Sequence, residues 1–200
     1  AGKTTLFNII NGSIKPDSGT VELYEIDITG FEPHQLFNLG ILRTFQIAHE
    51  FSTLTVLENL MMVPPNQFGE KLSYALLSNA KVKQQEEEIR QKAIEVINFL
   101  NLSHLTQELA GNLSGGQKKL LELARSIINE PEILLLDEPL AGVNPKLADD
   151  ILSLIKKLSN EGITILMVEH NIEAVMKISE RIVVLAEGSL IADGNPNEIR

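Results

Sequence analysis

The sequence contains no cysteine and no tryptophan, and only 4% of its residues are aromatic. Without cysteine it has no disulfide and no thiolate metal site, and its 4 histidines are too scattered to form a ligand cluster. Lysine and arginine number 17 against 27 acidic residues, a net charge of -10 that argues against a nucleic-acid-binding surface. No apolar run approaches the ~18 residues of a membrane-spanning helix, and no signal peptide is evident.

The composition and the pattern of apolar residues indicate a globular α/β protein. The chain has 200 residues, of which 44% are hydrophobic and 22% charged, enough for one domain with a substantial core. Strand-like and helical patterns alternate in residues 1–51 and again in residues 127–200, whereas residues 52–126 are mainly helical. We therefore expect one α/β core with a helical subdomain inserted between its two halves, and with a mainly parallel sheet.

Residues 133–139 are predicted to form a short buried strand. The segment Ile-Leu-Leu-Leu-Asp-Glu-Pro is wholly apolar until Asp137 and Glu138, and prolines bound it on both sides. Parallel α/β sheets place their ligands beyond the carboxyl ends of strands, where this acidic pair lies. Taken alone, the pair is better interpreted as a structural ion pair. A cation or a proton-transfer role would also explain why two carboxylates are desolvated there.

Residues 113–117, Leu-Ser-Gly-Gly-Gln, allow two interpretations. Ser114 and Gln117 have the spacing of a capping box at the start of a helix. A capping box leaves Gly115 and Gly116 unexplained, because each costs about 1 kcal/mol relative to alanine inside a helix. Glycines are useful where a ligand must approach the backbone amides closely. A helix N-terminus with open N–H groups and a serine hydroxyl then predicts a phosphate site.

The chain begins with Ala-Gly-Lys-Thr-Thr, which matches the second half of the phosphate-loop pattern G-x-x-x-x-G-K-[ST]. We expect the preceding strand and the first half of that loop to lie upstream of Ala1. Gly2 and Lys3 would surround the β- and γ-phosphates, and the Thr4 hydroxyl would bind Mg²⁺. Alone these residues are weak evidence. They gain weight from a following helix with Leu6, Phe7 and Ile10 on one face, which Gly12 closes, and from the acidic strand downstream.

Further elements follow from periodicity and turn residues. Strands are expected over residues 20–23, 41–45 and 163–168, and a hairpin joins 181–186 to 189–193 through Glu187 and Gly188. Helices are expected over residues 33–39, 53–62 and 84–100, and another begins at Pro145 with Asn144 as its cap. The strand at 163–168 is expected to be buried, with Glu169 and His170 at its carboxyl end.

These residues together resemble an ATPase subunit of the ABC transporter family. The resemblance covers essentially the whole chain and rests on motifs in the family's order and spacing. Within the family, Arg43-Thr-Phe-Gln46, Leu57-Glu-Asn-Leu60 and Leu140-Ala-Gly-Val-Asn-Pro145 are similar to ATPases of branched-chain amino-acid importers. The shared motif residues are Lys3, Thr4, Gln46, the segment 113–117, Asp137, Glu138 and His170.

The resemblance implies a P-loop NTPase fold and a role for each matching residue. Gly2, Lys3, Thr4 and Thr5 would hold the phosphates of ATP, while Thr4, Gln46 and Asp137 would hold Mg²⁺. Glu138 would polarise the attacking water, and His170 would contact the γ-phosphate. Gln46 would also sense the transmembrane partner. Without the resemblance, Gln46 and His170 would be ordinary polar residues at strand ends.

The resemblance also implies partners. The chain offers two helix N-termini for phosphate but only one complete set of residues for hydrolysis. In the family, two such subunits form a head-to-tail homo- or heterodimer. Ser114, Gly115, Gly116 and Gln117 would contact ATP held by the other subunit. Transmembrane permease subunits would attach the ATPases to the cytoplasmic face of the membrane, and no nucleic acid is expected. The transported substrate is set by other subunits.

Two departures from the family pattern are evident. The aromatic residue that stacks on adenine would lie upstream of this chain, and the loop that often ends in aspartate ends here in Asn144. Other functional classes also stay open. They are a lipopolysaccharide-export ATPase, a non-transport ABC ATPase such as a translation factor or a DNA-repair clamp, and a fragment that is not competent for catalysis.

Overall fold

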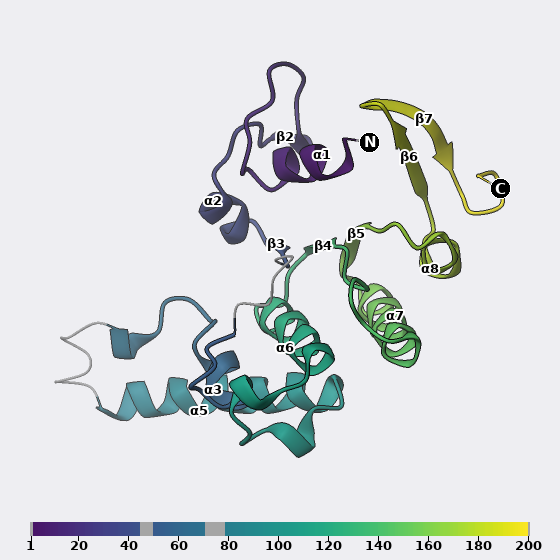
Figure 1. The fold of residues 1–200 in the computed structure, drawn as a ribbon. Helices are drawn as coiled ribbons and strands as arrows, with labels where there is room; N and C mark the ends of the chain where they lie inside the picture. The colour runs from purple at the N-terminus through teal and green to yellow at the C-terminus, as the bar shows by residue number, and fades with distance from the viewer. Residues whose placement is uncertain (1, 45–49, 71–78, 200) are drawn as a thin grey trace. The chain divides into compact units, whose positions relative to one another are not determined.

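The computed structural model describes residues 2–44, 50–70 and 79–199. Its backbone forms two compact units, one of residues 1–46 with 131–200 and one of residues 47–130. Figure 1 shows both units along the chain, coloured by residue number. The first unit contains every strand named below, and the second is helical in its described part.

The first unit is built on a parallel sheet with the strand order β3-β4-β5. β3 spans Ile41–Arg43, β4 Ile133–Asp137 and β5 Thr164–Val168. β4 pairs on both edges, with Ile133 opposite Ile41 on one side and opposite Thr164 on the other. Because it is central, its residues from Leu134 to Asp137 are buried. The predicted parallel sheet and the buried acidic strand are confirmed.

β5 corrects one expectation. The sequence predicts a fully buried strand, but Thr164 is exposed and Leu166 is 41% exposed. Among the described strands, β5 pairs with β4 alone and therefore forms an edge of this sheet. An apolar composition indicates that a strand can be buried, but it does not report how many neighbours the strand has.

Helix α1, Lys3–Ile10, follows Gly2 directly and packs through Phe7 into the core with Leu36, Ile41 and Leu135. The prediction that Leu6 shares one face with Phe7 and Ile10 is wrong, because Leu6 is 44% exposed whereas Phe7 is buried. Adjacent helical positions differ by about 100°, so the buried stripe of this short helix includes Phe7 and leaves Leu6 outside. Gly12 ends the helical region at φ +75°, and a Cβ there would lie 2.1 Å from the Phe31 carbonyl oxygen.

Two antiparallel hairpins complete the β structure. β6, Ile182–Ala186, and β7, Ser189–Gly194, are joined by Glu187 and Gly188, both at positive φ, as a two-residue turn requires. This hairpin is confirmed. The strand expected over residues 20–23 is shorter, since β1 spans Glu22–Leu23 and pairs with β2, Ile26–Asp27.

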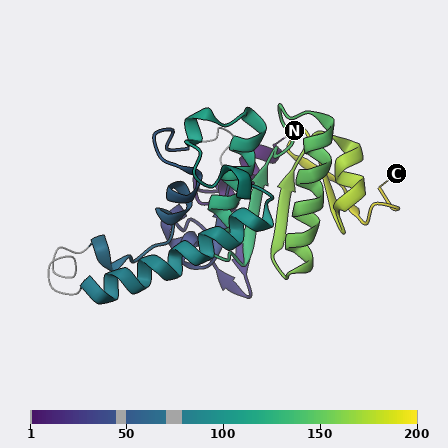
Figure 2. The same cartoon turned by 90° about the horizontal axis from the view of Figure 1, so that it is seen from below.

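Three further helices belong to this unit: α2 (Pro33–Asn38), α7 (Pro145–Asn160) and α8 (Ile172–Ile178). Asn144 caps α7 by accepting a hydrogen bond from the Leu147 N–H at 2.9 Å, as predicted. The α7 face that carries Ile151, Ile155 and Leu158 is buried. Seen in Figure 2, α7 runs alongside β5 and next to α8, so it covers one side of the strand that leads into Glu169 and His170.

The second unit packs α3 (Val56–Met61), α5 (Asn79–Phe99) and α6 (Gly115–Ile127) against one another. Short 3-10 helices span Phe68–Glu70, Ser103–Leu105 and Ala110–Asn112. α3 begins three residues later than predicted because Thr55 caps it, in a capping box with Glu58. Residues buried in this unit include Leu60, Ala93, Ile97, Leu121 and Ala124.

Candidate nucleotide site

The candidate site of the first unit lies where β4 and β5 end. The parallel register pairs Asp137 with Val168, so the residues that follow each strand are neighbours. The Glu138 N–H donates to the Val168 carbonyl oxygen at 2.9 Å and ties the two strand ends together. This register brings His170 close to Asp137 and Glu138, the acidic pair predicted at the end of the neighbouring strand.

Asp137 is the buried carboxylate of the site. The residue is 3% exposed, and its Oδ2 accepts a hydrogen bond from Arg43 at 2.7 Å. Within the described residues its Oδ1 is buried and finds no hydrogen-bond partner. A buried carboxylate oxygen without a donor is costly, and a cation ligated to it would remove that cost. The donor chemistry therefore fits Mg²⁺, although no cluster of three His, Cys, Asp or Glu residues occurs in the described part of the chain.

Arg43 belongs to the site, although the sequence motifs predicted no role for it there. It lies at the end of β3, and its guanidinium donates to Asp137 and, at 2.7 Å, to Asn8 Oδ1 on α1. It also stacks 5.2 Å from the centroid of the Phe7 ring. One side chain thus connects α1, β3 and β4. The usable sequence signal is an arginine that ends a strand paired with the acidic strand.

Arg43→Met should destabilise the protein, because it leaves the buried Asp137 carboxylate without a cation. We expect the free energy of unfolding to fall by about 3 kcal/mol, the scale of a broken buried pair. Chemical denaturation measures the change. Arg181→Met is the matched control, since the Arg181–Asp193 pair is exposed and its loss should leave stability nearly unchanged. Equal losses in both variants would contradict the importance of burial at Asp137.

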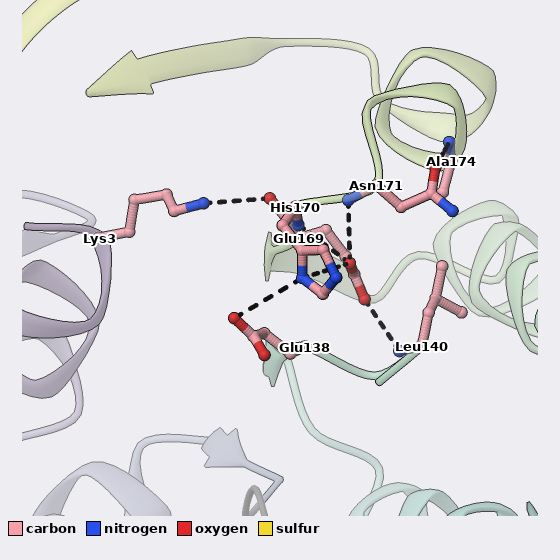
Figure 3. A network of polar contacts seen from close by, with 7 residues as sticks. All are labelled: Lys3, Glu138, Leu140, Glu169, His170, Asn171 and Ala174. Atoms are coloured by element: carbon pink, nitrogen blue, oxygen red, sulfur yellow. Dashed lines mark hydrogen bonds and ion pairs between the residues drawn. The ribbon is translucent and has the colours of Figure 1, made fainter. Parts of the chain in front are cut away.

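Gly2, Lys3, Thr4 and Thr5 form the start of α1. Gly2 caps the helix in a left-handed conformation at φ +86°, which glycine adopts without strain. Lys3 points toward the end of β5, where its Nζ donates to the Glu169 carbonyl oxygen at 3.2 Å (Figure 3). Thr4 and Thr5 are exposed. The helix N-terminus and the lysine therefore lie on the same side as the carboxyl ends of the strands.

Glu138 and His170 approach each other across the two strand ends. His170 Nδ1 lies 3.8 Å from Glu138 Oε1 and 3.8 Å from Glu169 Oε2 (Figure 3). The side chains of Glu138 and His170 are 39% and 67% exposed, so solvent reaches both. Glu138 has φ +47°, a conformation unusual for a residue with a side chain. A carboxylate held in this way can accept a proton from a bound water.

The segment 113–117 lies in the other unit, at the start of α6. Ser114 Oγ accepts from the Gln117 N–H at 3.4 Å, and Gln117 Oε1 accepts from the Ser114 N–H at 2.8 Å, so the predicted capping box is confirmed. The capping box does not use Gly115. A Cβ built on this exposed glycine meets no atom of the described residues within 4 Å, so the described part of the fold does not require glycine there.

Gln46, predicted to contact Mg²⁺ or water, lies outside the described residues. In the part of the chain that the structure describes, no helix is long and apolar enough to cross a membrane.

Comparisons with known proteins show the family of the chain. The ABC transporter family model matches residues 1–141. The "Probable branched-chain amino acid transport ATP-binding protein LivG" of Archaeoglobus fulgidus is 42% identical over 199 residues, spanning 100% of this chain and 76% of that protein. A solved ATP-binding cassette of an ABC transporter in its ADP conformation superposes with a TM-score of 0.81 at 39% identity, covering 98% of this chain and 77% of the other.

A second solved cassette is described as the dimeric structure of a post-hydrolysis state bound to ADP and Pi. It has a TM-score of 0.75 at 28% identity and covers 98% of this chain and 81% of the other. The family match over residues 1–141, the identity along the full chain and the shared fold lead to one conclusion: this chain belongs to the ABC transporter family, as one of its ATP-hydrolysing, ATP-binding cassettes.

Proposed function

We propose that this chain is the ATPase subunit that powers an importer of branched-chain amino acids or similar small solutes. The observation that carries the proposal is the convergence of Lys3, Glu138 and His170 at the carboxyl ends of β4 and β5. The substrate class rests on the names of relatives such as LivG, which favour it over lipopolysaccharide export. Their names likewise give no support to a translation factor or a DNA-repair clamp.

Phosphate binding is assigned to Gly2, Lys3, Thr4 and Thr5. The N-cap residue Gly2 has no side chain to cap the N–H groups at the start of α1, and this positive end of the helix favours an anion. The Lys3 ammonium now donates to the Glu169 carbonyl oxygen. On binding of ATP it would turn to the β- and γ-phosphates, which are stronger acceptors because they are charged.

Magnesium would be held by the Asp137 carboxylate through its unpartnered Oδ1, by the Thr4 hydroxyl and by Gln46. Bound there, Mg²⁺ neutralises charge on the phosphate oxygens of ATP. Arg43 holds the other Asp137 oxygen, so that Oδ1 keeps one orientation.

Hydrolysis is assigned to Glu138 and His170. Glu138 would orient a water for in-line attack on the γ-phosphorus and accept its proton, while His170 would donate a hydrogen bond to a γ-phosphate oxygen. Their separation of 3.8 Å lets both side chains reach one γ-phosphate and its attacking water. Most of the rate enhancement then comes from positioning and charge neutralisation.

Ser114, Gly115, Gly116 and Gln117 would bind the ATP of a second ATPase subunit in a head-to-tail dimer. The surroundings of Gly115 support this assignment, since no atom of the described residues lies within 4 Å of a Cβ built there. Permease subunits would hold the dimer at the cytoplasmic face of the membrane as a peripheral component. Two ATP molecules would then join the subunits, and hydrolysis would separate them.

Lys3→Ala tests the phosphate site. We expect ATP affinity to fall below detection in a titration. The unfolding temperature should change little, because the side chain makes one described hydrogen bond, a part-buried one to the Glu169 carbonyl oxygen, and a single such bond contributes only about 1 kcal/mol. Lys15→Ala removes an exposed lysine from outside the site and should leave ATP affinity unchanged. Wild-type affinity in Lys3→Ala would show that the phosphate site was assigned to the wrong residues.

The substrate class needs its own measurement. In cells that produce the complete transporter, uptake of radiolabelled leucine should depend on this subunit and disappear in Lys3→Ala. Persistent uptake of leucine with an ATPase-inactive subunit would contradict the assignment to branched-chain amino acids.

A further inference from the structure

Glu169 is a buried carboxylate that the proposed chemistry does not use. It lies between Val168, the last residue of β5, and His170. Its side chain is 0% exposed, whereas the neighbouring His170 side chain is 67% exposed. A buried carboxylate is strongly disfavoured unless donors surround it, so its contacts indicate what it does.

Both oxygens of Glu169 accept hydrogen bonds from backbone N–H groups of two separate loops (Figure 3). Oε1 accepts from the Leu140 N–H at 2.9 Å, in the loop after β4. Oε2 accepts from the N–H groups of His170 at 3.0 Å and Asn171 at 3.4 Å, in the loop after β5. One carboxylate therefore bridges the loop that carries Glu138 and the loop that carries His170.

The loop after β4 contains a strained backbone conformation that surrounding contacts have to hold. Glu138 has φ +47°, a left-handed conformation that costs free energy for a residue with a Cβ and persists only where surrounding contacts hold it. On one side of Glu138 the chain is fixed by its own N–H to the Val168 carbonyl oxygen. On the other side, the bond from Leu140 to Glu169 fixes it again.

We propose that Glu169 is a positioning residue, whose carboxylate sets the distance between Glu138 and His170 by holding both loops at once. The inference rests on the proposed roles of Glu138 and His170. Glu169 would not touch ATP through its side chain. Its backbone carbonyl meets Lys3, but that contact is independent of which side chain the residue carries.

Glu169→Asp isolates the bridging bond. Aspartate keeps the charge and readily bonds backbone groups of its own loop. Its side chain is shorter by one C–C bond, about 1.5 Å, so its carboxylate cannot also accept the hydrogen bond from the Leu140 N–H. We expect kcat for ATP to fall by roughly 10- to 100-fold, the scale of supporting contacts to a site. ATP affinity should stay within about twofold, because the Lys3 contact is to the backbone.

Glu169→Gln is the second variant. Glutamine keeps the length of the side chain but replaces one of the two acceptor oxygens with an amide NH₂ group. The control for stability is Ile155→Ala, on the buried face of α7. It should lower the unfolding temperature by at least as much as the Glu169 variants do, yet the folded protein should keep the wild-type kcat. If both Glu169 variants lose activity only in proportion to the unfolded fraction, the residue serves folding alone and the proposal is overturned.

A double-mutant cycle gives the sharpest test. If Glu169 acts through His170, adding Glu169→Asp to His170→Ala should cost much less kcat than Glu169→Asp costs alone. Full additivity would overturn the inference, as would wild-type kcat in Glu169→Asp. The proposed function fails separately. It fails if Glu138→Gln and His170→Ala both keep wild-type turnover, whatever the Glu169 variants do.

Discussion

Glu138→Gln should still bind ATP but turn it over at least about 10²-fold more slowly than the wild type, the scale of losing a general base. The amide has nearly the shape of the carboxylate and should keep the loop conformation, whose tie to β5 is made by the Glu138 backbone N–H. It cannot accept a proton from water. Phosphate release in steady state, alongside ATP binding in a titration, measures the two effects separately.

The same variant should accumulate as an ATP-bound dimer, because two subunits joined by ATP would no longer be released by hydrolysis. Gel filtration with and without ATP reports this shift. Glu161→Gln, at the exposed end of α7, is the matched control and should behave as the wild type in both assays. Normal turnover in Glu138→Gln would remove Glu138 from the proposed catalytic role.

Gly115→Ala should separate the capping function of residues 113–117 from a phosphate-binding function. Among the residues that the structure describes, no atom lies within 4 Å of a Cβ at Gly115, so alanine fits there. Alanine is also the better helix former by up to about 1 kcal/mol, so stability should hold or rise. Turnover should nevertheless fall by about 10² if the new methyl group blocks a phosphate from the backbone amides, as when one transition-state donor is lost.

Ser114→Ala is the matched comparison. It removes the hydroxyl that caps α6 and should lower stability by about 1 kcal/mol under either interpretation. If the segment were only a capping box, Ser114→Ala would lose stability, Gly115→Ala would gain it, and neither would change turnover of the folded protein. Loss of turnover in a variant that is as stable as the wild type supports the phosphate site instead.

Local sequence patterns predicted the elements whose signals are local. The apolar run before Asp137 predicted β4, Asn144 with Pro145 predicted the start of α7, and Glu187-Gly188 predicted the turn of the last hairpin. Each depends on side chains within a few residues of one another, where propensity and capping act.

Features that depend on distant contacts were not predicted. The bridge from Arg43 to Asp137 spans 94 positions, and the bond from Leu140 to Glu169 spans 29. No local sequence pattern predicts these two pairs, because strand register and loop geometry decide which residues meet. The exposure of Leu6 and Leu166 has the same origin, since burial depends on which elements pack against a face rather than on the residue alone.

The central claim is that the phosphate loop of one chain and residues 113–117 of another hold the same ATP. It is tested by mixing two variants that both carry Glu138→Gln, one with Lys3→Ala and the other with Gly115→Ala. Only a dimer of the two has an intact composite site, so sedimentation with ATP should show dimers in the mixture and monomers in each separate sample. Monomers alone in the mixture would contradict the claim.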